Sequence, residues 1–245
     1  MVILKVQNLI KKYGGRTVVN GVSFHVNQGE IVGLLGRNGA GKTTSFRMTI
    51  GMVTPNDGQV VFEGHDVSRL PMYKRARLGM GYLSQEPSVF QRLTVEQNLM
   101  AILETRAISK AEQRATCERL LTQFELAPLR GQLARTLSGG ERRKLEIARA
   151  LITEPSLILL DEPFSGVDPV AVEELQAEII RLRAKSNISI LITDHNVERT
   201  LEVCDRVYII HEGKVLREGT PRDLVRDEVV RDVYLGQNIR EDQFA

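Results

Sequence analysis

The stretch that most constrains this chain is a glycine-rich loop placed between an apolar run and a potential helix. The loop, residues 36–44, reads Gly-Arg-Asn-Gly-Ala-Gly-Lys-Thr-Thr and follows residues 31–35, a short apolar run that predicts a buried strand. Residues 45–50 can continue as a helix until Gly51. A glycine turn that served only the fold would not need Lys-Thr in this register, so the context favours a phosphate-binding loop.

The residue types of this loop suit the phosphates of a nucleoside triphosphate. Its glycines let the backbone approach a phosphate and turn N–H groups toward it, and the helix start adds a partial positive charge. Lys42 can reach the β- and γ-phosphates, where we expect it to act in catalysis as well, and the Thr43 hydroxyl can bind Mg²⁺. The residues expected at the nucleotide are Gly36, Arg37, Asn38, Gly39, Ala40, Gly41, Lys42, Thr43 and Thr44.

The composition is that of an ordinary globular protein. The 245 residues are 42% hydrophobic, which suffices for one α/β domain or two small ones, and the net charge of +2 predicts no nucleic-acid partner. Cys117 and Cys204 have neither metal-ligand spacing nor a disulfide pattern, which fits a reducing cytosol. Met1 leads directly into a strand-like run and the apolar runs are short, so we expect no signal peptide and no membrane span.

The order of predicted elements indicates a sheet domain with a helical insertion. Two antiparallel strands, around 3–9 and 18–26, are joined by a turn at Tyr13-Gly14-Gly15. From residue 94 to about 152 the pattern is helical, with a potential capping box at Thr94–Gln97. Later strands alternate with helices, which implies parallel strands with crossover helices. The other predicted strands are 59–62, 80–83, 157–160, 188–193, 207–210 and 215–218.

A second candidate site is the strand 157–160, which ends in two carboxylates. Ligand sites of open parallel sheets lie beyond the carboxyl ends of the strands, so these carboxylates should meet the phosphate loop. Asp161 suits the Mg²⁺ shell, and Glu162 suits the base or orienter of an attacking water. The alternative interpretation is a strand that simply ends in two solvated acids. The presence of a phosphate loop in the same chain favours the functional interpretation.

A third candidate is Ser138-Gly139-Gly140-Glu141 at the start of a helix that runs to about residue 152. Ser138 and Glu141 fit a capping box, so a purely structural interpretation exists. A cap does not need two glycines, however, and each glycine costs a helix about 1 kcal/mol relative to alanine. The glycines expose backbone N–H groups, so we predict a second anion site here.

These three motifs, in this order, resemble the ATPase subunits of ABC transporters, and the resemblance covers essentially the whole chain. It implies an α/β fold with a P-loop NTPase (RecA-like) mixed core, an N-terminal antiparallel β-subdomain and an inserted α-helical subdomain. The chain would then be one domain, residues 1–245. Its parts would be a core at 1–87 and 154–226, a helical signature subdomain at 88–153 and a tail at 227–245.

The resemblance also implies roles for residues that would otherwise be unremarked. Tyr13, otherwise a turn aromatic, would stack on adenine, and Gln85 would contact Mg²⁺ and sense the attacking water. Residues 165–168 would touch the opposite subunit, and His195 would bind the γ-phosphate in catalysis. Two positions depart from the family pattern, since Glu141 replaces a glutamine and Arg37 a proline. Neither departure removes a backbone donor or the Lys-Thr pair.

At finer detail the chain is similar to the ATPases of bacterial lipopolysaccharide exporters. The supporting stretches are residues 81–90, 97–101, 161–169, 192–197 and 233–236. In such proteins a groove receives a coupling helix from each membrane subunit, and Phe90, Arg92 and Leu93 match that groove, although Phe90 and Leu93 could instead be core residues. An apolar stripe at 229–234 should dock on its own domain, and we expect the chain after Gly236 to be frayed.

Two other functions stay open. The ATPases of branched-chain amino-acid importers share the Ser-Gly-Gly-Glu signature, and Asp194-His195-Asn196 with the Tyr-Leu-Gly ending at 234–236 favours the exporter. A soluble ABC ATPase of iron–sulfur cluster assembly is an alternative of another class.

The family implies a partner as well as a site. One chain has one phosphate loop and one signature, and these face each other across ATP only when a second copy is present. We therefore expect a C2 homodimer holding two ATP and Mg²⁺. Two integral membrane subunits would place it on the cytoplasmic face of the inner membrane, without direct contact to the transported substrate.

Overall fold

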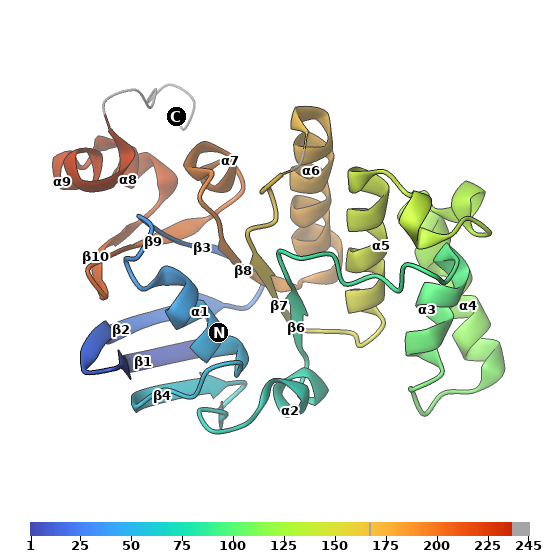
Figure 1. Cartoon of the computed structure of the whole chain (residues 1–245), viewed down its shortest axis with the longest axis horizontal. Helices are drawn as coiled ribbons and strands as arrows, with labels where there is room; N and C mark the ends of the chain where they lie inside the picture. Colours follow the sequence, from blue (N-terminus) through green and yellow to red (C-terminus); the bar gives the residue numbers. More distant parts are fainter. Residues whose placement is uncertain (167, 237–245) are drawn as a thin grey trace.

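The computed structural model describes residues 1–166 and 168–236, whose strands form two sheets. The strands are β1 (Val2–Tyr13), β2 (Arg16–Asn27), β3 (Ile31–Gly36), β4 (Asp57–Phe62), β5 (His65–Asp66), β6 (Met80–Leu83), β7 (Leu157–Asp161), β8 (Ser189–Thr193), β9 (Arg206–His211) and β10 (Lys214–Gly219). The first sheet has the order β2-β1-β4-β5 and the second the order β10-β9-β3-β8-β7-β6. Figure 1 shows the first sheet at the lower left.

Helices lie on both sides of the second sheet and beyond its edge. They are α1 (Lys42–Ile50), α2 (Met72–Arg77), α3 (Val95–Leu103), α4 (Lys110–Gln123), α5 (Gly139–Leu151), α6 (Pro169–Ser186), α7 (Val197–Leu201), α8 (Pro221–Arg226) and α9 (Glu228–Val230). Across the two described ranges, no helix combines the length and the apolar composition that crossing a membrane requires.

The second sheet is parallel except at one edge, as the alternation of strands and helices predicts. β3 runs parallel to β8 and β9, and β7 runs parallel to β6 and β8, whereas β10 is antiparallel to β9. Every residue of β3, β7 and β8 is buried. In β3, Ile31 and Leu35 pack toward α5 and α6, while Val32 and Leu34 pack toward α1 and the first sheet. Burial on both faces explains why these strands are continuous apolar runs.

The N-terminal hairpin is confirmed. β1 and β2 pair antiparallel, and the turn between them places Gly14 and Gly15 at φ of 51° and 83°. These left-handed conformations suit glycine because it has no Cβ to clash.

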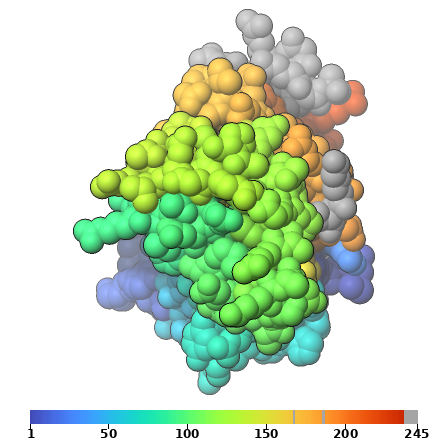
Figure 2. Space-filling view, turned by 90° about the vertical axis from the view of Figure 1, so that its right-hand side faces the viewer, coloured from blue at the N-terminus to red at the C-terminus, as the bar shows by residue number. Residues whose placement is uncertain are grey.

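The helices α3, α4 and α5 lie beyond the β6 edge of the second sheet, at the right of Figure 1, and cover most of the face seen in Figure 2. Of these, α5 packs against β6. The capping boxes predicted at Thr94–Gln97 and Ser138–Glu141 are both formed. Between α4 and α5 the chain forms two short 3-10 turns, at Ala127–Leu129 and Ala134–Thr136. Pro128 supplies no N–H for a helix there.

The C-terminal apolar stripe docks on its own chain. Val230 is fully buried and Tyr234 packs against the core, whereas Val229 is exposed. The expectation for residues after Gly236 lies outside the described residues.

A buried arginine, which sequence patterns did not indicate, anchors α1 to α2. The Arg75 side chain is 1% exposed, and its guanidinium donates to the carbonyls of Met48 and Thr49 at 2.9 and 2.6 Å. It also donates to the carbonyls of Leu70 and Ser68 at 2.8 and 3.1 Å. Burial lowers the pKa of Arg75 to about 10, so it stays charged at neutral pH. The cation therefore satisfies carbonyls at the end of α1, the helix that follows the phosphate loop.

We predict that Arg75→Met lowers the free energy of unfolding by about 3 kcal/mol, because several buried carbonyls lose their donor. Urea denaturation followed by circular dichroism measures this change. Arg77→Met is the matched control, because Arg77 is exposed on the same helix. Equal midpoints for the two variants would contradict the anchoring role.

Candidate functional site

The glycine loop lies between β3 and α1, as its sequence context predicts. A Cβ on Gly36 would lie 2.3 Å from the Ile210 carbonyl oxygen, and one on Gly41 would lie 2.7 Å from that of Val18. Gly41 also has a φ of 97°. Close backbone contact on two sides therefore requires glycine at both positions. Gly39 faces open space, so its left-handed φ of 80° is its only constraint.

A pocket lies over this loop and contains the predicted lysine. Lys42 is 4% exposed and its Nζ donates to the Gly36 carbonyl at 3.2 Å. Burial lowers the pKa of Lys42, and the negative charges of Glu162, Asp194 and Asp161 act in the opposite direction. The pocket is lined by Val18, Arg37, Asn38, Gly39, Gly41, Lys42, Thr43, Thr44 and Glu162. A buried ammonium beneath loop N–H groups suits a bound polyphosphate.

Three segments that follow the parallel strands β6, β7 and β8 meet at one carboxylate. Gln85 Nε2 donates to Glu162 Oε2 at 2.9 Å, and His195 Nδ1 lies 3.4 Å from the same oxygen. The structure thus brings together Gln85, Glu162 and His195, which come from distant parts of the sequence. A carboxylate held by an amide and an imidazole at the mouth of a phosphate pocket can orient or deprotonate a water.

Asp161, beside Glu162, is the predicted metal ligand. It is 5% exposed, and Tyr82 donates its hydroxyl to Oδ2 at 3.3 Å. Burial raises the pKa of Asp161, and the hydrogen bond from Tyr82 partly offsets this. The carboxylate of Asp161 and the Thr43 hydroxyl are hard oxygen donors, the type that Mg²⁺ takes together with substrate phosphates. This donor set fits Mg²⁺.

The turn between β9 and β10 supports the loop from the far side, a contact that the sequence did not reveal. Gly213 N donates to the Ala40 carbonyl at 2.8 Å, and Asn20 N donates to the Gly213 carbonyl at 2.7 Å. A Cβ on Gly213, whose φ is 76°, would lie 2.7 Å from the Val18 carbonyl oxygen. The Glu212-Gly213 pair between two apolar strands marks a turn, but no local signal names its contact.

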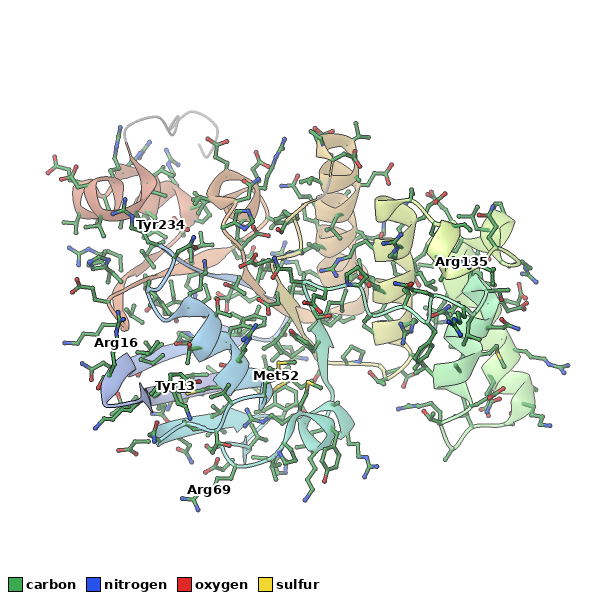
Figure 3. All side chains as sticks on the ribbon, viewed as in Figure 1. Tyr13, Arg16, Met52, Arg69, Arg135 and Tyr234 are labelled. Atoms are coloured by element: carbon green, nitrogen blue, oxygen red, sulfur yellow. The ribbon has the colours of Figure 1, made fainter. Side chains whose placement is uncertain are left out.

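The predicted signature lies on a different part of the molecule. Glu141 N donates to Ser138 Oγ at 3.3 Å, and Ser138 N donates to Glu141 Oε2 at 2.8 Å, at the start of α5. Gly139 has nothing near its would-be Cβ, so its backbone is accessible. No residue of this motif lines the loop pocket. In Figure 3, Arg135 just before the signature lies on the opposite side from Tyr13.

Two other sequence-predicted positions, Tyr13 and Asp168, lie outside the residues that line the loop pocket. Tyr13 is 48% exposed at the tip of the first hairpin, with the Lys11 ammonium 5.2 Å from its ring centre. Asp168 caps α6 by accepting from Ala171 N at 3.0 Å, while Val167, in the loop expected at the opposite subunit, lies outside the described residues. An exposed aromatic ring leaves a face free for a planar ligand.

The predicted groove residues lie at the surface between β6 and α3. Phe90 is 45% exposed, so it is not a core residue, and the Arg149 guanidinium lies 4.5 Å from its ring centre. Arg92 is exposed and Leu93 is half-buried. The loop is held by Asn98, whose Oδ1 accepts from Phe90 N at 2.8 Å and whose Nδ2 donates to Phe90 O at 3.0 Å.

Comparison with known proteins agrees with this geometry. Residues 19–165 match the ABC transporter family. The chain is 51% identical to the lipopolysaccharide export system ATP-binding protein LptB of Escherichia coli (strain K12), covering 98% of this chain and 100% of that one. It is also 51% identical to the LptB of Acidithiobacillus ferridurans, covering 97% and 98%. A crystal structure of an ATP-binding cassette of an ABC transporter in its ADP conformation superposes with a TM-score of 0.86 at 28% identity, covering 97% of this chain and 100% of that chain.

We predict that Gly213→Ala weakens ATP binding about tenfold, because an added methyl would displace the turn from the loop it supports. Gly64→Ala is the control: its φ of 80° imposes similar strain, but its Cβ would meet open space. Titration of a fluorescent ATP analogue into each variant gives the dissociation constants. Equal affinities would show that the turn does not position the loop.

Proposed function

Because this chain belongs to the ABC transporter family as an ATP-binding subunit, we propose that two copies of it hydrolyse ATP to power lipopolysaccharide export from the bacterial inner membrane. The observation that carries this conclusion is an identity of about half, over nearly the whole chain, to exporter ATPases. A pocket that joins the glycine loop and Lys42 to Glu162 supports it. The branched-chain amino-acid importer and the iron–sulfur assembly ATPase, the two alternatives, have no such support among these relatives.

Hydrolysis follows from the groups around the pocket. The loop N–H groups and Lys42 hold the phosphates, while Glu162 lies where it can take a proton from a water attacking the γ-phosphate. Gln85 and His195 fix the Glu162 carboxylate from two sides. Thr43, Asp161 and the Oε1 atom of Gln85 would hold Mg²⁺, which neutralises charge on the phosphate oxygens when bound. Tyr13 would stack on the adenine.

The second half of each site would come from another copy. Ser138, Gly139, Gly140 and Glu141 lie away from the loop pocket of their own chain, on the subdomain that we assign to residues 88–153. A C2 pair would place each signature over the partner's phosphate loop, so that ATP joins two protomers. Loss of the γ-phosphate would remove these contacts and let the pair open.

Two integral membrane subunits would use this closure. The exposed Phe90, with Arg92 and Leu93, offers an apolar and basic surface next to Gln85 in the sequence. A membrane subunit seated there would move with the helical subdomain. Binding to membrane subunits would hold the pair on the cytoplasmic face of the inner membrane. The lipid substrate would then meet only the membrane subunits.

We predict that Glu162→Gln abolishes turnover but keeps ATP binding, so that ATP and Mg²⁺ accumulate a dimer. Lys42→Ala, which removes the buried ammonium, should lose both binding and dimerisation. Size-exclusion chromatography with light scattering distinguishes the two states. A Glu162→Gln protein that stays monomeric at saturating ATP and Mg²⁺ would rule out the two-copy site.

We also predict that the chain, tagged and purified from detergent-solubilised membranes, brings two membrane proteins with large periplasmic domains. Mass spectrometry identifies them, and Phe90→Ala should reduce their recovery while leaving ATP affinity unchanged. Recovery of importer permeases, or of soluble proteins with cysteine clusters, would instead support one of the two alternatives.

A further inference from the structure

Asp194 is a buried carboxylate that the scheme above leaves without a role. It is 0% exposed and follows β8 directly. Its Oδ2 accepts from Phe164 N at 2.9 Å, and its Oδ1 accepts from Asn196 N at 2.8 Å. The one side chain thus binds the segment after β7 and the segment after β8 at the same time.

These bonds extend the pairing of β7 and β8 past the ends of the strands. The parallel pairing reaches Asp161 opposite Thr193, and Glu162 N then donates to the Thr193 carbonyl at 2.7 Å. The next bond across the gap comes from Phe164 N to the side chain of Asp194 rather than to a backbone carbonyl. Glu162 therefore lies between a backbone bond on one side and a side-chain bond on the other.

The backbone at Glu162 needs such support. Its φ is 48°, a left-handed conformation that a residue with a side chain adopts at an energetic cost. This conformation turns the chain out of the sheet, and Ser165 N closes the turn by donating to the Glu162 carbonyl at 3.2 Å. Surrounding contacts must hold a residue in this conformation, and the bond that Phe164 N donates to Asp194 is one of them.

A carboxylate is better suited to this place than an amide. Two backbone N–H groups point at the two oxygens of Asp194, and asparagine has a single acceptor oxygen. An asparagine could satisfy one segment only and would place its NH₂ group against the N–H of the other. Burial raises the pKa of Asp194, while the two backbone N–H groups act in the opposite direction.

We propose that Asp194 is a positioning residue that fixes the Glu162 carboxylate relative to His195. The inference rests on the water-activating roles proposed for Glu162 and His195. His195 Nδ1 lies 3.4 Å from Glu162 Oε2 and 3.5 Å from Asp194 Oδ1, so the three side chains form one cluster. Asp194 acts on hydrolysis through this geometry, and its two oxygens accept from Phe164 and Asn196 rather than from the phosphate loop.

The test is Asp194→Asn, measured for turnover and for ATP affinity separately. We expect turnover to fall about a hundredfold, the size of effect that a misplaced catalytic group produces. ATP affinity in EDTA should stay within about twofold of the parent, since the loop contacts are unchanged. Asp205→Asn is the control, because Asp205 accepts from Ile31 N at 2.9 Å but lies after α7, on a segment that takes no part in the pocket. It should keep turnover.

A double-mutant cycle with His195→Ala separates positioning from stability. If Asp194 acts through the Glu162–His195 pair, Asp194→Asn should cost at most about threefold more in the His195→Ala background. Amide hydrogen exchange gives a second measurement: exchange should rise in residues 162–166 and 193–197 of Asp194→Asn. A full hundredfold loss in both backgrounds, or an equal loss of ATP affinity, would overturn the proposal.

Two single variants separate this inference from the function on which it rests. If Glu162→Gln and His195→Ala lose turnover while Asp194→Asn keeps it, the positioning role alone is wrong. If Glu162→Gln and His195→Ala both keep turnover, the roles assigned to the pocket are wrong and the positioning role falls with them.

Discussion

Close backbone contact around residues 36–41 is the interaction on which the site depends. The Ile210 and Val18 carbonyls lie so near the loop that neither Gly36 nor Gly41 can carry a side chain. These carbonyls belong to β9 and β2, so the loop packs against one strand of each sheet. These contacts also fix the position of Lys42 at the start of α1, because its ammonium donates to the Gly36 carbonyl.

The rest of the chemistry depends on parallel strands that end at the same edge. β6, β7 and β8 deliver Gln85, Glu162 and His195 to one point although up to 110 positions separate them in the chain. The strand pairing ends at Asp161 and Thr193, and one backbone bond, from Glu162 N to the Thr193 carbonyl, continues past it. Beyond that point a side chain, that of Asp194, links the segments that follow β7 and β8.

The features that could be predicted from the sequence are those encoded by residues close together in the chain. A strand, a glycine loop and a helix form one contiguous signal, and so do the capping boxes at Thr94 and Ser138, which the structure confirms. Sequence reasoning missed Gly213 and Arg75, because each acts on a segment more than 20 residues away that no local pattern names. Asp194 could have been found, since it follows a buried parallel strand just as Asp161 does.

The capping box at the start of α5 has a consequence for how tightly two copies can hold ATP. The Glu141 carboxylate accepts from Ser138 N, so a negative charge already occupies the positive end of this helix. In the proposed pair, a phosphate bound by the partner would share that end with an internal carboxylate of the same sign. A glutamine would cap the helix equally well without the charge. In that pair the acid would weaken the closed state, so the two copies would reopen readily after each hydrolysis rather than stay closed.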